Sequence, residues 1–441
     1  MDMNPFYYPI LALLGAVLPL AAQQPQAGDK PVMLTDLVTG VKLWETTPAQ
    51  LETQFANQGL QWLSENKDRA RFFGSYAIFK PDLACPEVIA DFQNGLLSGV
   101  SVSIFNRGDQ TSMDMSRREF DTYLRVIRES ISAALAVNPT ERGRDPKSAV
   151  KANGWIWHKP PSVYLMEYSY VKQIKTREQD FRPEFIRLRV SPTRPVRGPN
   201  TVQPLRKSTL TANLTRDNQG DIAILNIPMV DQGPKGYCAV ATAERIFRYY
   251  GITVDQHELA QIANTSEGGG TDPIQMIEAL ERIAGRMQVR VRDLQRYEIK
   301  QFLKIVENYN REAKRNSQPS VNPLIHGVFD IQAVFSAMDA ETLKLARTEK
   351  DKTGYTKFQR LIAASIDKGI PVMWGVQLGL FPEPGLPQTG GGHMRLIIGY
   401  NPKTQEILYS DTWGRAHAKK RMPMAEACAM TTGLYYIEPI R

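Results

Sequence analysis

The sequence predicts an α+β protein in which two folded regions, residues 31–190 and 217–441, are joined by a basic linker. Three observations support this class. Helix-start motifs occur in both regions, runs of alternating polar and apolar residues occur beside them, and the segment between the regions is rich in proline and has no Asp or Glu. With 441 residues, 42% hydrophobic and 23% charged, the chain is long enough for two or three globular domains.

The first region combines capped helices with alternating strands. Thr47 and Gln50, and again Ser116 and Glu119, have the spacing of a capping box, in which each side chain binds the backbone N–H of the other residue. The apolar residues expected on the buried faces of the two helices are Leu51, Phe55, Leu60 and Leu63, and Phe120, Leu124, Ile127 and Ile131. The expected half-buried strands are 100–105 and 185–190. The region contains no residue pattern typical of a catalytic site.

The linker, residues 191–216, is expected to be a semi-rigid and exposed spacer. It contains Pro192, Pro195, Pro199 and Pro204 among basic residues. Such a composition cannot bury enough surface to fold alone. The linker would also be open to a processing protease.

The second region is expected to place its helices first and its strands later, in two half-domains with a ligand cleft between them. Helices are expected to begin at Cys238, Asp255 and Asp272, followed by a charged helix over 297–315. The expected strands are 324–329, 372–378, 393–400, 407–410 and 434–437.

Cys238 has the sequence surroundings of a cysteine nucleophile. It opens an expected helix, and the partial positive charge of a helix N-terminus favours thiolate. A thiolate also needs an imidazole, and His393 follows three glycines far downstream. Asp411 can accept a hydrogen bond from the other imidazole nitrogen. The side-chain amide of Gln232 and the backbone N–H of Cys238 can donate to the developing oxyanion.

The spacing of His393 and Asp411 predicts that their side chains meet. The residues between them read as two strands joined by a turn at 401–404. If the hairpin centres on Pro402, His393 and Asp411 are directly opposed, with Cβ atoms about 4.5–5.5 Å apart. A register shift of one residue would turn the two side chains to opposite faces.

These residues resemble the active sites of papain-like cysteine peptidases, and more narrowly those of the bacterial C39-like branch. The shared pattern is Gln six residues before Cys, a distant His after glycine, and a short polar residue two before Trp-Gly, and it covers about residues 222–440. The resemblance implies a two-lobed catalytic domain with a helical lobe and an antiparallel β lobe. It implies the nucleophile Cys238, the base and acid His393, the orienting Asp411, the oxyanion donor Gln232 and the shielding Trp413.

Three residues depart from papain itself. Lys235 and Ala239 stand where papain has Cys and Trp, and Asp411 stands where papain has Asn. These differences favour the C39-like branch or another divergent member of the clan, and they leave the substrate subsites open. In relatives a glycine-bearing segment often lines the cleft. The residues expected to bind substrate are Gly269, Gly270, Gly392 and Trp413.

The sequence therefore predicts an exported cysteine peptidase that hydrolyses a peptide or isopeptide bond through a thioester acyl-enzyme. A non-catalytic protein that holds a peptide in the same fold is one alternative, and an acyl-transfer enzyme of the same clan is another. The intact set of Gln232, Cys238, His393 and Asp411 argues against the binding protein. The sequence does not separate hydrolysis from transfer, and it indicates neither the peptide or protein substrate nor the oligomeric state.

No metal, cofactor or nucleic acid is expected. The chain has no HExxH or paired CxxC motif. Asp255 and Glu258 fit a capping box, so His257 is expected in a solvated first helical turn. The formal charge of +8 and the pI near 9.2 are mild for this length, and no dense Lys/Arg stripe interleaved with aromatic residues is present.

Residues 1–22 are expected to be a signal peptide. A short apolar run over 10–22 precedes polar residues, and it is too short and interrupted for a spanning helix. No Lys or Arg precedes the run, so an uncleaved anchor or a different start codon is the alternative. After cleavage the protein is expected to be secreted or periplasmic, without a stable membrane span. Cys85 and Cys428 could form a bridge, but a fold of this size needs none, and free thiols are expected.

Two roles are open for residues 31–190. They precede the catalytic region as a pro-region would, so one hypothesis is latency relieved by cutting within 191–216. The other is a permanent recognition domain. We favour recognition, because roughly 160 residues with their own helices and strands exceed what blocking a cleft requires, and such a domain can fold and present its own surface.

Overall fold

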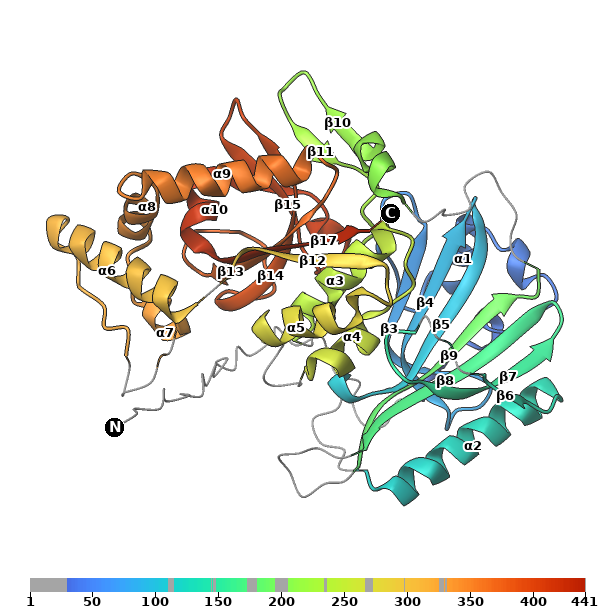
Figure 1. The fold of residues 1–441 in the computed structure, drawn as a ribbon. Coiled ribbons are helices and arrows are strands. Elements are labelled where there is room, and N and C mark those ends of the chain that lie inside the picture. The colour runs from blue at the N-terminus through green and yellow to red at the C-terminus, as the bar shows by residue number, and fades with distance from the viewer. Residues whose placement is uncertain are drawn as a thin grey trace.

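The structure is a computed structural model that describes residues 30–109, 115–143, 145, 148–172, 181–194, 205–233, 236–265, 273–296, 298–324, 329 and 331–440. These residues form two large sheets with helices packed on them, so the chain is α+β (Figure 1). We call the described residues up to 194 the N-terminal part and those from 205 the C-terminal part. The apolar run expected to be a signal peptide lies outside the described residues.

The N-terminal part is one sheet with helices against it. Its strands are β1 (Val32–Met33), β2 (Leu60–Trp62), β3 (Arg69–Ala77), β4 (Ala84–Gln93), β5 (Leu96–Asn106), β6 (Thr140–Glu141), β7 (Asn153–Lys159), β8 (Ser162–Lys172) and β9 (Phe181–Pro192). The order is β1-β3-β4-β5-β9-β8-β7-β6, with β2 also on β3, and β1 with β3 is the parallel pair. The helices are α1 (Pro48–Phe55) and α2 (Arg117–Leu135), with 3-10 turns at Thr35–Leu37, Leu43–Glu45 and Arg107–Asp109.

Both predicted capping boxes are present, at Thr47 and at Ser116. The four residues expected on the inner face of α2 are all buried. The first helix is shorter than predicted, because the chain leaves α1 after Phe55 and turns through Gly59, whose φ is +77°. Leu60 therefore begins β2 instead of continuing the helix.

Both faces of the central strands of this first sheet are largely buried. One face forms an apolar core under α1 and α2, with residues such as Phe72, Val88, Val102, Met166 and Leu188. The opposite face is polar and also buried, with Arg71, Glu87, Ser103, Glu167 and Arg187. The expectation of half-buried strands is wrong for these residues, because helices of the C-terminal part cover the polar face (Figure 1).

The second sheet is antiparallel throughout. Its strands are β10 (Leu214–Arg216), β11 (Ile222–Ile224), β12 (Val289–Gln295), β13 (Val372–Leu378), β14 (Gly391–Asn401), β15 (Glu406–Ser410), β16 (Lys420–Pro423) and β17 (Thr431–Pro439). The order is β10-β11-β14-β13-β17-β12, and β15 joins β14 to β16. Four expected strands correspond to β13, β14, β15 and β17, whereas the one expected over 324–329 lies largely outside the described residues.

The helices of the C-terminal part are α3 (Cys238–Tyr249), α4 (Gln256–Ala263), α5 (Pro273–Ala284), α6 (Ile299–Arg315), α7 (Ile331–Ser336), α8 (Ala340–Thr348), α9 (Lys352–Ile366) and α10 (Met424–Met430). Short 3-10 helices lie at Lys207–Asn213 and Arg415–His417. Both α3 and α9 pack against β14. Residues of α6, α7 and α8 share a smaller apolar cluster, at the end of the molecule far from the first sheet (Figure 1).

The segment expected as a spacer joins the second sheet over its last residues. Leu210 is fully buried, and Leu205 and Leu214 pack against the same core. Since β10 also pairs with β11, the chain from 205 to 216 is anchored to the sheet, although residues 206–209, 211, 212 and 216 are exposed. Three leucines outweigh the linker-like composition here, because each buries apolar surface against the sheet.

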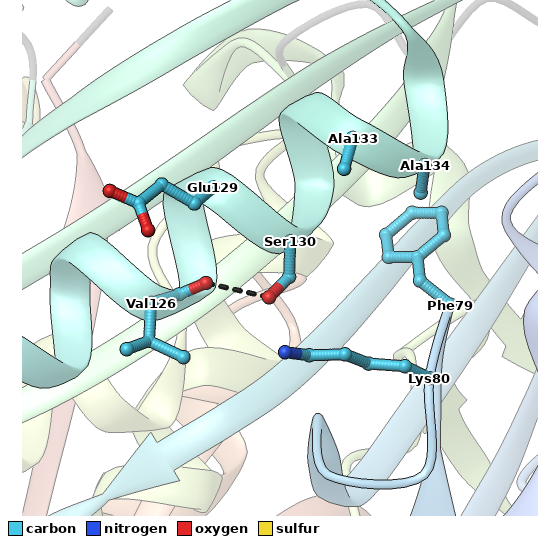
Figure 2. A pocket seen from close by; sticks show the side chains of 7 residues that line it. All are labelled: Phe79, Lys80, Val126, Glu129, Ser130, Ala133 and Ala134. Atoms are coloured by element: carbon cyan, nitrogen blue, oxygen red, sulfur yellow. Dashed lines mark hydrogen bonds between the residues drawn. The ribbon is translucent and has the colours of Figure 1, made fainter.

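A hollow on the N-terminal part lies between α2 and the turn after β3 (Figure 2). It is lined by Phe79, Lys80, Val126, Glu129, Ser130, Ala133 and Ala134. The Ser130 hydroxyl donates to the carbonyl of Val126 in its own helix, at 2.6 Å. None of the lining residues belongs to the expected site. Within the described ranges, no helix has the length and apolar character needed to cross a membrane.

Candidate active site

Cys238 is the first residue of α3, and its side chain is half-buried. The helix behind it is set into the core, with Val240, Ala243 and Ile246 fully buried. The Thr242 hydroxyl donates to the carbonyl of Met394 in β14, at 3.3 Å. The nucleophile candidate therefore stands at a fixed helix start against the strand that carries His393.

His393 and Asp411 form a buried pair. His393 Nε2 lies 2.6 Å from Asp411 Oδ1, and both side chains are 0% exposed. The same carboxylate oxygen accepts the backbone N–H of Thr412 at 2.8 Å, and Asp411 Oδ2 accepts Arg395 Nε–H at 2.8 Å. Because both carboxylate oxygens are held, the orientation of Asp411 is fixed.

The hairpin register differs from the prediction that gave this contact. Asn401 pairs with Glu406 and Leu396 with Ser410, with a bulge just before Gly399. The Asn401 side chain accepts the N–H groups of the two residues that follow Pro402, and this widens the turn. The centring on Pro402 is therefore wrong.

Continuing the observed register would set Asp411 opposite Arg395 instead of His393. The shift is two residues, which keeps the parity of the pleat. His393 therefore stays on the same face as Asp411, as a diagonal neighbour within reach of its carboxylate.

Trp413 lies flat on the imidazole. The ring centroids of Trp413 and His393 are 4.2 Å apart and the planes differ by 10°. The indole covers one face of the His393 ring. Gly392, which directly precedes His393 in β14, is exposed. A Cβ added to Gly392 would meet nothing within 4 Å. Gly269 and Gly270 lie outside the described residues.

Gln232 is anchored to the residue that follows Asp411. Its backbone N–H donates to the carbonyl of Thr412 at 2.9 Å, and its Oε1 accepts the Thr412 hydroxyl at 2.6 Å. Since the amide oxygen accepts this bond, the NH2 group is the donor end that Gln232 can offer to an oxyanion.

The charges at the site are set by the buried pair. Burial is the largest influence on the pKa of His393 and lowers it, but Asp411 and Cys238 together outweigh it and raise the pKa to about 9. Burial also opposes ionisation of Asp411, yet His393 and then Arg395 lower its pKa to about 2. The imidazole is therefore held as a cation beside Cys238 near neutral pH.

The two imidazole nitrogens of His393 have different surroundings. Since Nε2 faces Asp411, Nδ1 is the nitrogen that can exchange a proton with Cys238. Within the described part of the chain, Nδ1 is buried and no nitrogen or oxygen hydrogen-bonds to it. This arrangement suits a thiolate–imidazolium pair oriented by a carboxylate.

Sequence reasoning missed Arg395, which is fully buried. Arg395 Nη1 lies 2.9 Å from Glu383 Oε2, and the Tyr409 hydroxyl donates to the same oxygen at 2.6 Å. The guanidinium thus links the carboxylates of Asp411 and Glu383. Its position two residues after His393 could have indicated this contact, because residues i and i+2 of a strand lie on the same face of the sheet.

Arg245 was also missed. It is fully buried in α3 and donates to the backbone carbonyls of Asp411 (3.0 Å) and Pro228 (2.9 Å) and to the Ser410 hydroxyl (2.6 Å). Burial lowers its pKa to about 10, while Asp411 acts in the opposite direction. Arg245 ties α3 to the end of β15.

Two other expectations concern residues outside this cluster. Asp255 caps α4 by accepting the N–H groups of His257 and Glu258, but Glu258 pairs with Arg187 and does not close a capping box. His257 is only 11% exposed and lies 3.7 Å from Glu87, so a solvated position is the wrong expectation. The N-terminal part covers this turn.

Cys85 and Cys428 are buried free thiols, in β4 and α10. Burial raises the pKa of Cys85 to about 12, and burial likewise raises the pKa of Cys428. Within the ranges described above, no three His, Cys, Asp or Glu side chains are grouped so that they could hold a metal ion.

Comparison with known proteins found a match to the sequence profile of the Peptidase_C39 like family over residues 325–437. The expected resemblance is confirmed over this stretch, which includes His393 and Asp411 and begins after Cys238. Among solved structures, the chain is similar to xylellain, a cysteine protease from Xylella fastidiosa, at 13% identity and a TM-score of 0.27, covering 54% of this chain and 91% of that one. No curated protein matched the chain.

Proposed function

We propose that this protein is a cysteine peptidase of the C39-like type, with Cys238 as nucleophile and His393 as its proton partner. The observation that carries the proposal is the buried His393–Asp411 contact of 2.6 Å, next to a half-buried cysteine at a helix start. Asp411 and Cys238 both raise the pKa of His393. A cleft that only held peptide would have no use for this charge arrangement.

The proposed reaction follows from these positions. The Cys238 thiolate attacks the carbonyl carbon, and the oxyanion is met by the Gln232 amide and the backbone N–H of Cys238. His393 then gives its proton to the departing amine as the thioester forms. Water loses a proton to His393 and attacks the thioester, which releases the acid and restores the thiolate beside the protonated imidazole. Asp411 holds the ring throughout.

The proposal also covers the two lobes of the catalytic domain, the export of the protein and the class of its substrate. The helices α3 to α5 and the sheet around β14 would form the two lobes of the catalytic domain, with residues 1–22 directing export. The substrate would be a peptide or protein, with Gly392 and Trp413 beside it. Acyl transfer to an amine would use the same thioester, and the mass of the released product distinguishes the two reactions.

Cys238 is expected to be alkylated by iodoacetamide near neutral pH much faster than Cys85 or Cys428. The latter two are buried and their pKa values are raised, so little thiolate is present. Mass spectrometry of the intact protein and its peptides after short exposures gives the three rates. Equal labelling of the three thiols in the folded protein would contradict an activated Cys238.

Gln232→Ala is expected to reduce kcat by about 10²–10³, the usual loss for one oxyanion donor. Steady-state hydrolysis of a fluorogenic peptide measures this loss. Alkylation of Cys238 by iodoacetamide forms no oxyanion, so its rate should stay unchanged and serves as the control. If kcat were that of wild type, Gln232 would not be the oxyanion donor.

A further inference from the structure

We infer that Arg71, in the first sheet, positions the loop 231–233 that carries the oxyanion donor. The N-terminal part would then be a working component of the catalytic site. This inference rests on the proposed role of Gln232. It differs from both roles expected for residues 31–190 from the sequence, because neither a removable inhibitor nor a recognition domain has to hold the oxyanion loop.

Arg71 contacts Asp231. Arg71 lies in β3 and is 3% exposed. Its Nε donates to Glu87 at 2.7 Å, which sets the guanidinium on the polar face of the sheet. Its Nη1 lies 3.0 Å from Asp231 Oδ1. Arg71 thus reaches from a strand that is fixed on both faces to the residue directly before Gln232.

Asp231 holds the turn that carries Gln232. Asp231 Oδ1 also accepts the backbone N–H of Gly233 at 2.8 Å, so the carboxylate brackets Gln232 from both sides. Gly233 has a φ of +68°, a conformation that other residues adopt reluctantly. The turn therefore depends on the aspartate for its shape, and the aspartate is held by Arg71.

The opposite side of the loop is bonded to the residue that follows Asp411. Gln232 is bonded to Thr412 through both its backbone and its side chain. A Cβ added to Gly414 would lie 3.1 Å from Asp231 Oδ2, so the chain after Asp411 approaches the loop closely. The oxyanion loop is therefore clamped between the strand end that orients His393 and the first sheet.

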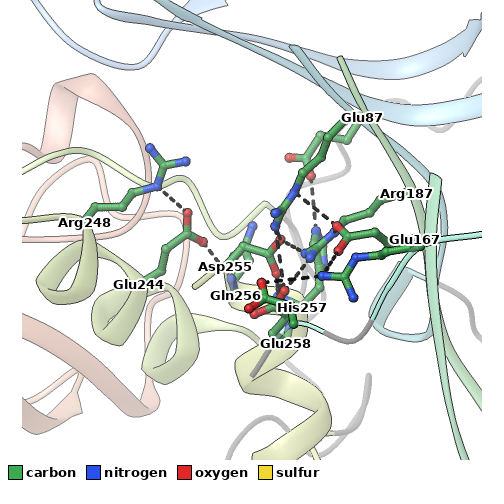
Figure 3. A network of polar contacts seen from close by, with 12 residues as sticks. Glu87, Glu167, Arg187, Glu244, Arg248, Asp255, Gln256, His257 and Glu258 are labelled. Atoms are coloured by element: carbon green, nitrogen blue, oxygen red, sulfur yellow. Dashed lines mark hydrogen bonds and ion pairs between the residues drawn. The ribbon is translucent and has the colours of Figure 1, made fainter. Parts of the chain in front are cut away.

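The clamp is part of a broad contact between the two parts. Arg187, on the same polar face as Arg71, donates to Glu167 at 2.9 Å within the sheet and pairs with Asp255 and Glu258 at the start of α4 (Figure 3). Leu63 and Ile89 form an apolar cluster with Met229 near the oxyanion loop. Removing one partner of a buried ion pair is strongly destabilising, so the sheet is not a loosely docked module.

The catalytic consequence follows from geometry. An oxyanion donor is effective only when it is already aimed at the position where charge develops. A misplacement of about 1 Å can cost about 10²-fold in rate. Without the Arg71–Asp231 link the Gln232 side chain is still present. One side of its turn is free, however, so its amide is no longer held in position.

The main test pairs Arg71→Met with Glu87→Gln, so that the buried Glu87 carboxylate is not left without its arginine while Asp231 loses the contact under test. This double variant is expected to lower kcat for a fluorogenic peptide by up to about 10²-fold, with KM and the iodoacetamide alkylation rate of Cys238 little changed. Asp231→Asn, which keeps an acceptor for Gly233, should lower kcat less. Arg189→Met is the matched control, since Arg189 crosses to Asp255 and Glu258 without touching the loop. Thermal unfolding shows that each variant is folded.

A double-mutant cycle separates positioning from general damage. In a Gln232→Ala background, the Arg71→Met and Glu87→Gln changes should cause little further loss, because the donor that they position is gone. A full additional loss in the Gln232→Ala background would overturn the inference. So would a kcat of the Arg71→Met and Glu87→Gln variant, in the otherwise wild-type protein, equal to that of wild type or of Arg189→Met.

The same variants are compared in the burst of p-nitrophenolate from p-nitrophenyl acetate, in which Cys238 takes the acetyl group through an oxyanion. A wild type with a burst but no peptide hydrolysis would contradict the peptidase proposal, and the burst rates would still decide the role of Arg71. A wild type that shows neither a burst nor steady turnover of the ester or of peptide would overturn both.

Discussion

Replacing His393 with alanine is expected to reduce peptide hydrolysis by about 10⁴-fold or more, to the level of Cys238→Ala. Without the imidazole, the thiol has no group to hold its proton and the departing amine has no acid. Both roles need the pair that the structure shows, with Nε2 on Asp411 and Nδ1 left for the sulfur. Initial rates with a fluorogenic peptide measure the loss.

Two controls sharpen this result. His158→Ala changes an exposed histidine of β7 and should leave hydrolysis at the wild-type rate. The double variant Cys238→Ala with His393→Ala should be no slower than either single variant, because residues that act as a unit are not additive. A His393→Ala protein that kept a substantial part of wild-type activity would rule out His393 as the proton partner.

The residues of the candidate site could be proposed from the sequence because each requirement of cysteine-peptidase chemistry leaves a local trace. Short windows of sequence place Cys238 at a helix start, His393 near the start of a strand and Asp411 directly after the next strand. The contact between His393 and Asp411 was predicted correctly from a wrong hairpin register. An error of two residues leaves both side chains on the same face of the sheet. An error of one residue would have lost it.

The buried charges could not be predicted in the same way. Arg187 in a strand with alternating polarity reads as a solvated side chain, and only the arrival of α4 from 71 residues away makes Glu258 its partner. Glu383 reaches Arg395 from a loop without any periodic pattern. Pairings of this kind depend on which face another part of the chain covers, and no local window contains that information.

Asp411→Ala is expected to affect stability and activity together. It removes the acceptor from Arg395 and His393 at once, and the buried guanidinium keeps only Glu383. Losing one partner of such a buried network costs about 3–5 kcal/mol in the free energy of unfolding. Activity should fall roughly 10²–10⁴-fold, less than for loss of the nucleophile, because the imidazole is still present. Denaturant unfolding and initial rates measure the two effects.

Asp411→Asn separates the charge of this residue from its hydrogen bond. Asparagine keeps an oxygen for His393, so activity should lie between that of Asp411→Ala and wild type. Its NH2 group would face the Arg395 Nε–H, donor against donor, where the carboxylate now accepts. Asp367→Asn, at an exposed site, is the matched control and should behave as wild type. An Asp411→Ala protein as active as wild type would show that Asp411 does not orient the imidazole.

The pH dependence of Asp411→Asn tests the charge directly. In the wild type the pKa of His393 is raised from 6.5 to about 9, so its pairing contributes stability that is fully present below pH 6.5 and is lost as the pH rises through about 9. The alkaline limb of kcat/KM should fall in the same range, as the imidazolium loses its proton. Without the Asp411 charge, both transitions should move to lower pH. Profiles of Tm and kcat/KM against pH that superimpose on those of wild type would mean that the carboxylate does not set the charge of His393.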